Sequence, residues 1–229
     1  MIFFIGMDDT DNSESRGTGH LARQVAACLS ADFQVIGVVR HQLLFDPRVP
    51  YTKHNSSATI VLRSGGPVGL EVVLQLVKEC MLADFQPGSD PGLCVAAEVP
   101  EEITQFGLRA KLELVTQEEA RRLASRHGIL LEGLGGTEGG VIGALAGVGL
   151  AASGEDGRYV LVGSMRELSG LQPVAAVLAA GVDHLQTLDG QPVRQGLILT
   201  SKLRPARRGG LPVGYVRWEE DHWQPLKLD

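Results

Sequence analysis

The residues best suited to chemistry in this 229-residue sequence form an acidic turn near its start, Asp8-Asp9-Thr10-Asp11-Asn12. Three carboxylates fall within four residues, where like charges repel one another unless a cation neutralises them. Carboxylate and water oxygens suit Mg²⁺, which takes the rest of its ligands from substrate phosphates. The turn therefore predicts Mg²⁺ held by Asp8, Asp9 and Asp11 beside a nucleotide. The simpler alternative is a capped turn followed by a solvated Asx-turn.

The predicted strand before the turn and the predicted helix after it would place the turn beside a bound phosphate. Met1 to Met7 is mostly large and apolar, which predicts a buried strand. Thr18 to Leu29 has an apolar residue at every fourth position, which predicts a helix capped by Thr18. Because a helix N-terminus at the end of a strand favours anions, we expect Thr18 and Gly19 to face the phosphates. A helix cap is the commoner role for such a threonine.

Two further segments carry groups that suit a nucleotide. A polar loop before a predicted strand at 57–62 would hold ribose or phosphate oxygens if it folds beside the acidic turn, and is otherwise an ordinary loop. A glycine-rich turn would let backbone N–H groups approach an anion, although close helix packing explains its glycines equally well. The two segments are Thr52-Lys53-His54-Asn55-Ser56-Ser57 and Gly135-Gly136-Thr137-Glu138-Gly139-Gly140.

Strands and helices alternate along the rest of the chain, which predicts an α/β (α+β) fold with layered mixed sheets. We place a domain boundary between residues 110 and 130, giving an acidic-turn domain at 1–120 and a glycine-rich, mainly β domain at 121–229. Further strands are expected at 33–39, 93–98, 158–163, 196–201 and 213–218, and further helices at 67–82, after the capping box Thr116-x-x-Glu119, and within 133–152.

Composition limits the partners and the compartment. The formal net charge of −6 gives no overall attraction for a polyanion, so RNA would have to bind a local basic cluster, for which Lys202-x-Arg204-x-x-Arg207-Arg208 is the candidate. A solvated turn is the commoner role for such a cluster. The three cysteines are widely spaced and form no Cys-x-x-Cys pair, which favours a reducing compartment. No stretch is long enough to span a bilayer, so we expect a cytoplasmic protein that binds no membrane.

Four segments taken together resemble one known family, and the acidic motif is the most specific of them. They are Gly6-Met7-Asp8-Asp9-Thr10-Asp11-Asn12, Thr18 before Leu21-Ala22, Thr52-x-His54-Asn55-Ser56-Ser57, and Gly139-Gly140-Val141-Ile142-Gly143-Ala144-Leu145-Ala146. The pattern is similar to that of the archaeal tRNA-isoleucine agmatinylcytidine (agmatidine) synthetases. The resemblance runs through most of the chain and corresponds to the family's N-terminal kinase-like and ferredoxin-like domains.

The resemblance implies that the aspartates bind Mg²⁺, that ATP is the nucleotide, and that Thr18 stands at the family's phosphorylated threonine. The family spends ATP to activate a cytidine carbonyl for attack by the amine of agmatine. Two features depart from it. A Cys and a Thr flank that threonine in the family, where this chain has Gly17 and Gly19. The family also carries an OB-fold and a zinc ribbon after these domains, whereas this chain ends at Asp229 without cysteine pairs for a ribbon.

The leading hypothesis is an ATP- and Mg²⁺-dependent phosphotransferase or ligase-like enzyme that acts on a small amine or nucleotide, with tRNA reached through a separate RNA-binding partner. Its predicted catalytic residues are Asp8, Asp9, Asp11 and Thr18. The predicted nucleotide contacts are Thr10, Asn12, Gly17, Gly19, His54, Asn55, Ser56, Gly139 and Gly140. The alternatives are a non-catalytic nucleotide-binding accessory protein of RNA modification and one subunit of a split synthetase.

Overall fold

The computed structural model describes residues 1–12, 14–49 and 54–228, and strands and helices alternate through its first half. Its elements are β1 (Ile2–Asp8), α1 (Thr18–Leu29), β2 (Gln34–Gln42), β3 (Ser56–Arg63), α2 (Leu70–Leu82), β4 (Gly92–Ala96), α3 (Glu101–Ala110), α4 (Gln117–Arg126), β5 (Leu130–Gly133), α5 (Val141–Ser153), β6 (Arg158–Leu161), the 3₁₀ helix η1 (Met165–Glu167), β7 (Leu171–Pro173), α6 (Val174–Ala179), β8 (His184–Gln186), β9 (Leu197–Leu199), β10 (Ala206–Arg208), β11 (Leu211–Glu219) and β12 (His222–Leu226).

The strands form one continuous sheet in the order β5-β4-β1-β3-β2-β6-β10-β11-β12-β9-β7, with β8 pairing parallel to β11. The predicted mixed α/β architecture is therefore confirmed. In the first half of the sheet β1 lies between β3 and β4 and is antiparallel to both. Hence the end of β1 meets the beginnings of β3 and β4, rather than a row of carboxyl ends as in a parallel sheet.

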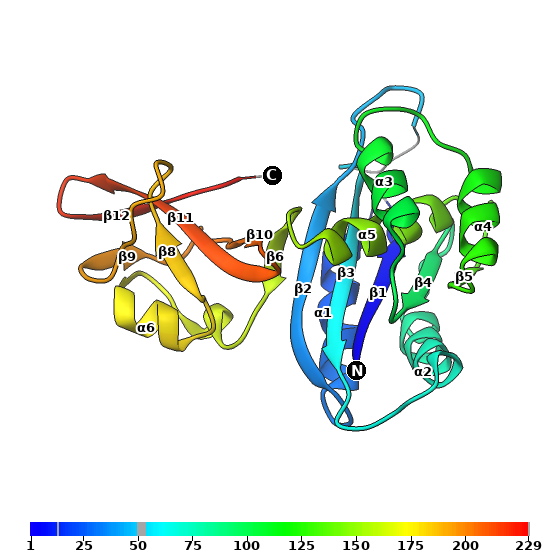
Figure 1. The fold of residues 1–229 in the computed structure, drawn as a ribbon, viewed down its shortest axis with the longest axis horizontal. Coiled ribbons are helices and arrows are strands. Elements are labelled where there is room, and N and C mark those ends of the chain that lie inside the picture. The colour runs from blue at the N-terminus through cyan, green and yellow to red at the C-terminus, as the bar shows by residue number, and fades with distance from the viewer. Residues whose placement is uncertain (13, 50–53, 229) are drawn as a thin grey trace.

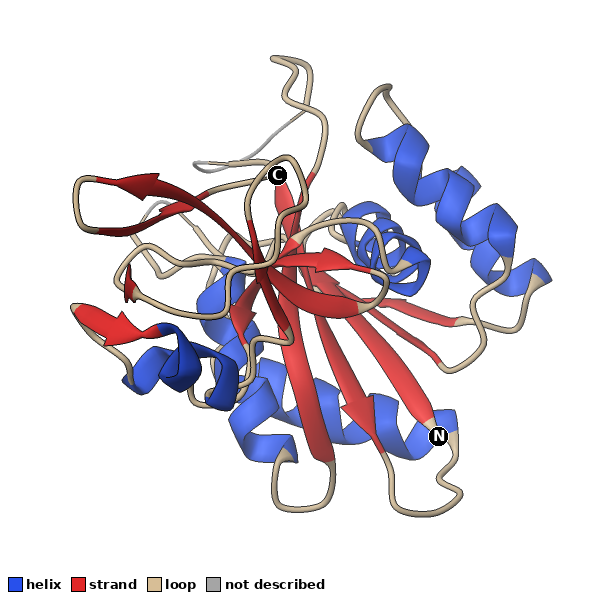
Figure 2. Ribbon diagram, turned by 60° about the vertical axis from the view of Figure 1, so that its left-hand side comes forward, coloured by secondary structure: helices blue, strands red, loops and turns tan. Residues whose placement is uncertain are grey.

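The sheet passes through two lobes, visible side by side in Figure 1. The first lobe holds β1 to β5 with α1 to α5, and the second holds β7 to β12 with α6. Helices cover both faces of the first-lobe strands, as Figure 2 shows. Apolar residues of α1 and α2 pack in a core on one face, and those of α3, α4 and α5 pack in a core on the other.

The glycine-rich helix α5 packs directly on β1. A methyl group at Gly6 would lie 2.0 Å from the carbonyl oxygen of Ala144, so only glycine allows this approach. Gly107 of α3 also packs closely on this helix, since a methyl group there would lie 2.7 Å from the carbonyl oxygen of Ala146. Because α5 is thus part of the first lobe, we propose a domain boundary near Gly154 in place of one near residue 120.

Local sequence signals set several other boundaries. The capping box is confirmed, since the hydroxyl of Thr116 accepts a hydrogen bond from the backbone N–H of Glu119 at the start of α4. Glycine in the left-handed conformation at Gly154 ends α5 (φ 78°). None of the helices in the described part of the chain has the length and apolar character needed to cross a membrane.

Candidate functional site

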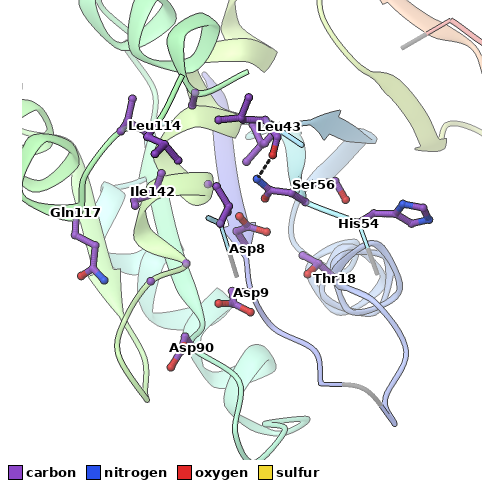
Figure 3. A pocket seen from close by; sticks show the side chains of 18 of the residues that line it. Asp8, Asp9, Thr18, Leu43, His54, Ser56, Asp90, Leu114, Gln117 and Ile142 are labelled. Carbon is purple, nitrogen blue, oxygen red and sulfur yellow. Dashed lines mark hydrogen bonds between the residues drawn. The ribbon is translucent and has the colours of Figure 1, made fainter. Parts of the chain in front are cut away.

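A cavity of about 280 Å³ lies where β1 ends and β3 and α5 begin. Its walls come from segments far apart in the sequence, shown from close by in Figure 3. The lining residues are Asp8, Asp9, Asp11, Thr18, Leu43, Leu44, Val49, His54, Asn55, Ser56, Asp90, Ala110, Glu113, Leu114, Val115, Gln117, Thr137, Gly139, Gly140, Ile142 and Gly143. The fold therefore brings the acidic turn, the polar loop and the glycine turn to one place.

Asp8 and Asp9 enter the cavity because the chain turns sharply at the end of β1. Asp9 has a φ of 51°, a left-handed conformation that aspartate tolerates better than most residues. Its carbonyl oxygen accepts a hydrogen bond of 3.2 Å from the backbone N–H of Asp90. The carboxylate of Asp8 occupies the space beside Gly143, where a methyl group would lie only 1.7 Å from Oδ2. Glycine at position 143 thus makes room for this carboxylate against α5.

The two carboxyl groups are held at an electrostatic cost. Burial, helped by the neighbouring charges of Asp9 and Asp11, raises the pKa of Asp8 to about 7 against the lowering effect of a backbone hydrogen bond. Burial also raises the pKa of Asp9 to about 6, with the charges of Asp90 and Asp11 acting in the same direction. A bound cation would favour the ionised forms of both groups and offset this cost.

The acidic groups do not form a complete metal site by themselves. Among the residues that the structure describes, no group of three or more His, Cys, Asp or Glu side chains is arranged to hold a metal ion. Asp11 instead accepts a hydrogen bond of 3.1 Å from the hydroxyl of Thr18. The described side chains thus do not form a three-aspartate coordination shell, although Asp8, Asp9 and Asp11 all line the cavity.

Thr18 lies at the first position of α1, and the residue that caps the helix is Gly17. The prediction that Thr18 is the cap is therefore wrong. Glycine in an extended conformation starts the helix without a side-chain bond, which leaves the hydroxyl of Thr18 available for other contacts. That hydroxyl accepts a hydrogen bond of 3.2 Å from Thr10 and donates to Asp11. The threonine is buried yet lines the cavity, so its oxygen is fixed at the wall.

Four of the residues predicted to contact a nucleotide do not line the cavity: Thr10, Asn12, Gly17 and Gly19. The side chain of Asn12 accepts hydrogen bonds from the backbone N–H groups of Glu14 and Ser15, as in an Asx-turn, and donates to the carbonyl of Pro87. The structural alternative considered for the turn thus holds for Asn12. Its side chain shapes the loop instead of facing the cavity.

The polar loop supplies His54, Asn55 and Ser56 to the cavity wall, while Thr52 and Lys53 lie outside the described residues. The amide of Asn55 donates a hydrogen bond of 2.8 Å to the carbonyl of Leu44. The hydroxyl of Ser56 accepts one of 3.1 Å from Arg40. Figure 3 shows the exposed His54 directed away from the aspartates. Ser56 is therefore the best placed of the three for a bound oxygen.

The glycine turn lines the cavity and packs closely against neighbouring backbone. Gly139 and Gly140 line the cavity. Gly140 is also packed against backbone, since a methyl group there would lie 2.6 Å from the carbonyl oxygens of Asp8 and Asp90. Its N–H donates to the carbonyl of Asp90 at 2.9 Å and so is not available to a phosphate. Close packing is thus the main reason for glycine at position 140.

Several residues that complete the cavity carry no signal in the sequence. Asp90 adds a carboxylate from the loop before β4, and its Oδ1 accepts a hydrogen bond of 2.5 Å from the N–H of Thr137. Leu43, Leu114 and Ile142 form an apolar wall opposite Thr18. Acidic groups on one side and aliphatic groups on the other suit a ligand with a charged end and a flat apolar part.

Comparison with known proteins shows what this chain is similar to in sequence and in fold. No protein-family model matches the chain. The tRNA(Ile2) 2-agmatinylcytidine synthetase TiaS of Pyrococcus horikoshii is 30% identical over 156 residues, which make up 65% of this chain and 36% of that protein. The crystal structure of a TiaS–tRNA(Ile2)–ATP complex is 22% identical with a TM-score of 0.57, and that of a tRNA fluorescent labeling enzyme is 23% identical with a TM-score of 0.57.

Each of these two structures matches 65% of this chain, and the match covers 36% of the other chain. The chain thus spans about a third of the length of the relatives it matches. At these identities the two structures establish the fold, and the Pyrococcus protein adds similarity in sequence. The resemblance to the tRNA agmatidine synthetase family that the motifs predict is therefore confirmed over about two thirds of this chain.

Proposed function

We propose that this chain is an ATP- and Mg²⁺-dependent enzyme of the ligase or phosphotransferase type that acts in tRNA modification. The observation that carries the proposal is the cavity itself, in which two carboxylates, a fixed threonine hydroxyl and an apolar wall meet. The similarity to a tRNA agmatidine synthetase over 65% of the chain supports the choice of reaction class. The three free cysteines support a cytoplasmic location as part of the same proposal.

In this proposal Asp8 and Asp9 are the protein's ligands to Mg²⁺. Mg²⁺ in nucleotide sites commonly uses one or two carboxylates and completes its shell with water and phosphate oxygens, which fits the absence of a third ligand among the described side chains. When bound, the ion would neutralise charge on the phosphates. The raised pKa values of both groups support this role, because burial and the neighbouring carboxylates disfavour their ionised forms, which a bound cation would favour.

Thr18 and Asp11 would position the reacting end of the nucleotide. Asp11 holds the hydroxyl proton of Thr18, so the lone pairs of that oxygen are oriented by the protein. If that oxygen attacked the γ-phosphorus of ATP, its proton would pass to Asp11 and ADP would leave. Ser56 would add a hydroxyl from the start of β3, and the apolar residues Leu43 and Ile142 would contact the base.

The experiment that tests the proposal is ATP turnover by the purified chain with Mg²⁺, resolving ADP, AMP and pyrophosphate, with and without tRNA and agmatine. We expect Asp9→Asn to abolish Mg²⁺-dependent turnover. Asp32→Asn removes one exposed carboxylate after α1 and serves as the matched control. AMP with pyrophosphate would support ligase-type activation, and ADP would support a phosphotransferase.

Tight ATP binding without any product would contradict an enzyme and favour a nucleotide-binding accessory protein. Turnover that appears only with an added RNA-binding protein would indicate one subunit of a split synthetase. Normal turnover by Asp9→Asn would refute the assignment of the metal ligands while leaving the activity itself intact.

A further inference from the structure

The basic segment near the end of the sequence does not form the exposed cluster that its spacing suggests. The buried side chain of Arg207 donates hydrogen bonds to the carbonyl oxygens of Ala151 and Gly210 and to the hydroxyl of Tyr159. Arg208 donates to the carbonyl of Glu155. These two cations therefore hold the junction between the lobes and are not presented to an RNA phosphate.

A different set of cations gathers on the surface, drawn from three separate segments. Arg23 lies on α1, Arg166 in η1 and Arg204 in the loop before β10. Burial, followed by the charges of Arg166 and Arg204, lowers the pKa of Arg23. Burial, followed by the charges of Arg166 and Arg158, lowers the pKa of Arg204. Like charges have thus been brought together across the two lobes at an electrostatic cost.

No carboxylate among the described residues forms an ion pair with Arg23, Arg166 or Arg204. Their hydrogen bonds go to backbone carbonyls, from Arg23 to Gly19 at 2.7 Å, from Arg204 to Leu203 at 2.7 Å and from Arg166 to Val160 at 3.4 Å, and Arg23 also contacts the ring of His20. A guanidinium group has five donors, so most of this capacity is left for a ligand. An anion would relieve the repulsion and use these donors.

A second cavity, of about 120 Å³, lies between β6, η1 and the loop before β10. Arg166, Arg204 and Ser201 line it, together with Thr200, whose hydroxyl already donates to the carbonyl of Gly170. Guanidinium groups and a serine hydroxyl around a small open cavity are groups that bind phosphate oxygens. The cavity and the charge cluster therefore indicate the same chemical class of ligand.

The cluster continues along α1 toward the acidic cavity. The ring of His20 lies between two guanidinium groups, with Nε2 3.4 Å from Arg16 and Nδ1 3.3 Å from Arg23. Arg23 follows Thr18 by five residues, or about 7.5 Å along a helix. Burial, followed by the charges of Arg16 and Arg23, lowers the pKa of His20. Among the described residues, the charge of Asp84 acts against this and raises it. The cations therefore form a row that begins beside the first turn of α1, which suits several phosphates in succession.

We propose that Arg23, Arg166 and Arg204 form a phosphate-binding site that holds the backbone of an RNA strand beside the acidic cavity. The choice of RNA rests on the proposed function, whereas the phosphate chemistry rests on the cluster alone. A row of cations longer than one phosphate group fits a strand better than a free anion. With a net charge of −6, the chain attracts a polyanion only through such a local cluster.

The test is the binding of fluorescein-labelled tRNA, measured by anisotropy over a series of KCl concentrations without ATP. We expect Arg166→Gln to weaken binding roughly tenfold and to reduce the slope of log K against log salt by about 0.9, the loss of one phosphate contact. The triple variant of Arg23, Arg166 and Arg204 to Gln should lose most binding. Arg194→Gln removes an exposed charge elsewhere on the second lobe and should change binding less than about twofold.

Arg166 is exposed, so its single variant keeps the test valid if the triple variant folds poorly. Equal affinity and equal salt slope for Arg166→Gln and Arg194→Gln would overturn the proposal. If the site binds inorganic phosphate but no tRNA, the assignment to RNA is overturned. Because no ATP is present, failure of the proposed enzymatic function leaves this measurement unaffected, and ATP binding by the triple variant should remain normal.

Discussion

Replacing Asp8 with asparagine should change how the stability of the chain depends on pH. The ordinary pKa of an aspartate is 3.8, and burial raises that of Asp8 to about 7 in the folded chain. A group whose pKa is raised on folding stabilises the folded state. This stabilisation is fully present below the pKa of the group in the unfolded chain, and it is lost as the pH rises through the pKa in the folded chain. At roughly 1.4 kcal/mol per unit, a shift of about three units corresponds to about 4 kcal/mol.

This figure is an upper value, because Asp8 lines a cavity that water reaches. The assay is urea unfolding at about pH 4 and about pH 8 in EDTA, with Asp32→Asn as the charge control. Asp8→Asn should match the wild type at the lower pH and be more stable by up to about 4 kcal/mol at the higher pH. Mg²⁺ with ATP should stabilise only the wild type at the higher pH. An equal difference between the two proteins at both pH values would refute this reasoning.

Three further predictions concern packing and hydrogen bonding. Thr116→Ala removes the hydroxyl that caps α4, so the free energy of unfolding should fall by about 1 kcal/mol in urea, and an unchanged value would show that the cap contributes nothing. Gly143→Ala places a methyl group 1.7 Å from Oδ2 of Asp8. Calorimetry should therefore show that Mg²⁺-dependent ATP binding is weakened by about tenfold or more. The control variant Gly19→Ala adds a methyl group that meets no atom within 4 Å, so it should bind ATP normally. Arg207→Ala removes three buried or part-buried hydrogen bonds, so chemical unfolding should show a loss of about 3 kcal/mol; a loss below about 1 kcal/mol would mean that this side chain does not hold the lobes together.

The parts of the fold that could be predicted are those with strong local signals. The apolar run of β1, the four-residue spacing in α1 and the capping box of α4 each lie within one element, and the structure confirms all three. Helix α3 was missed because Gly107 and several polar residues hide its pattern, and its glycine is explained only by contact with α5. The three-residue strands of the second lobe likewise depend on partners distant in sequence.

The residues of the candidate site likewise divide into those that have a local sequence signal and those that have none. Asp8, Asp9 and Thr18 could be identified because strand, acidic turn and helix follow one another in the sequence. Asp90 could not, because its place in the cavity depends on the pairing of β4 with β1. The apolar wall also escaped prediction, since an isolated leucine such as Leu114 has no local mark that separates a ligand contact from a core residue.

The short strand β6 covers the edge of the first-lobe sheet. Three of its residues pair with β2 on one side, and its first residue, Arg158, pairs with Ala206 of β10 on the other. Without that cover, the nine-residue strand β2 would present unpaired N–H and C=O groups along an open sheet edge, which is a template for joining another chain. Through the pairing of β10 with β6, the second lobe would then help to keep this edge of the first-lobe sheet covered at high protein concentration, even if the second lobe binds no ligand.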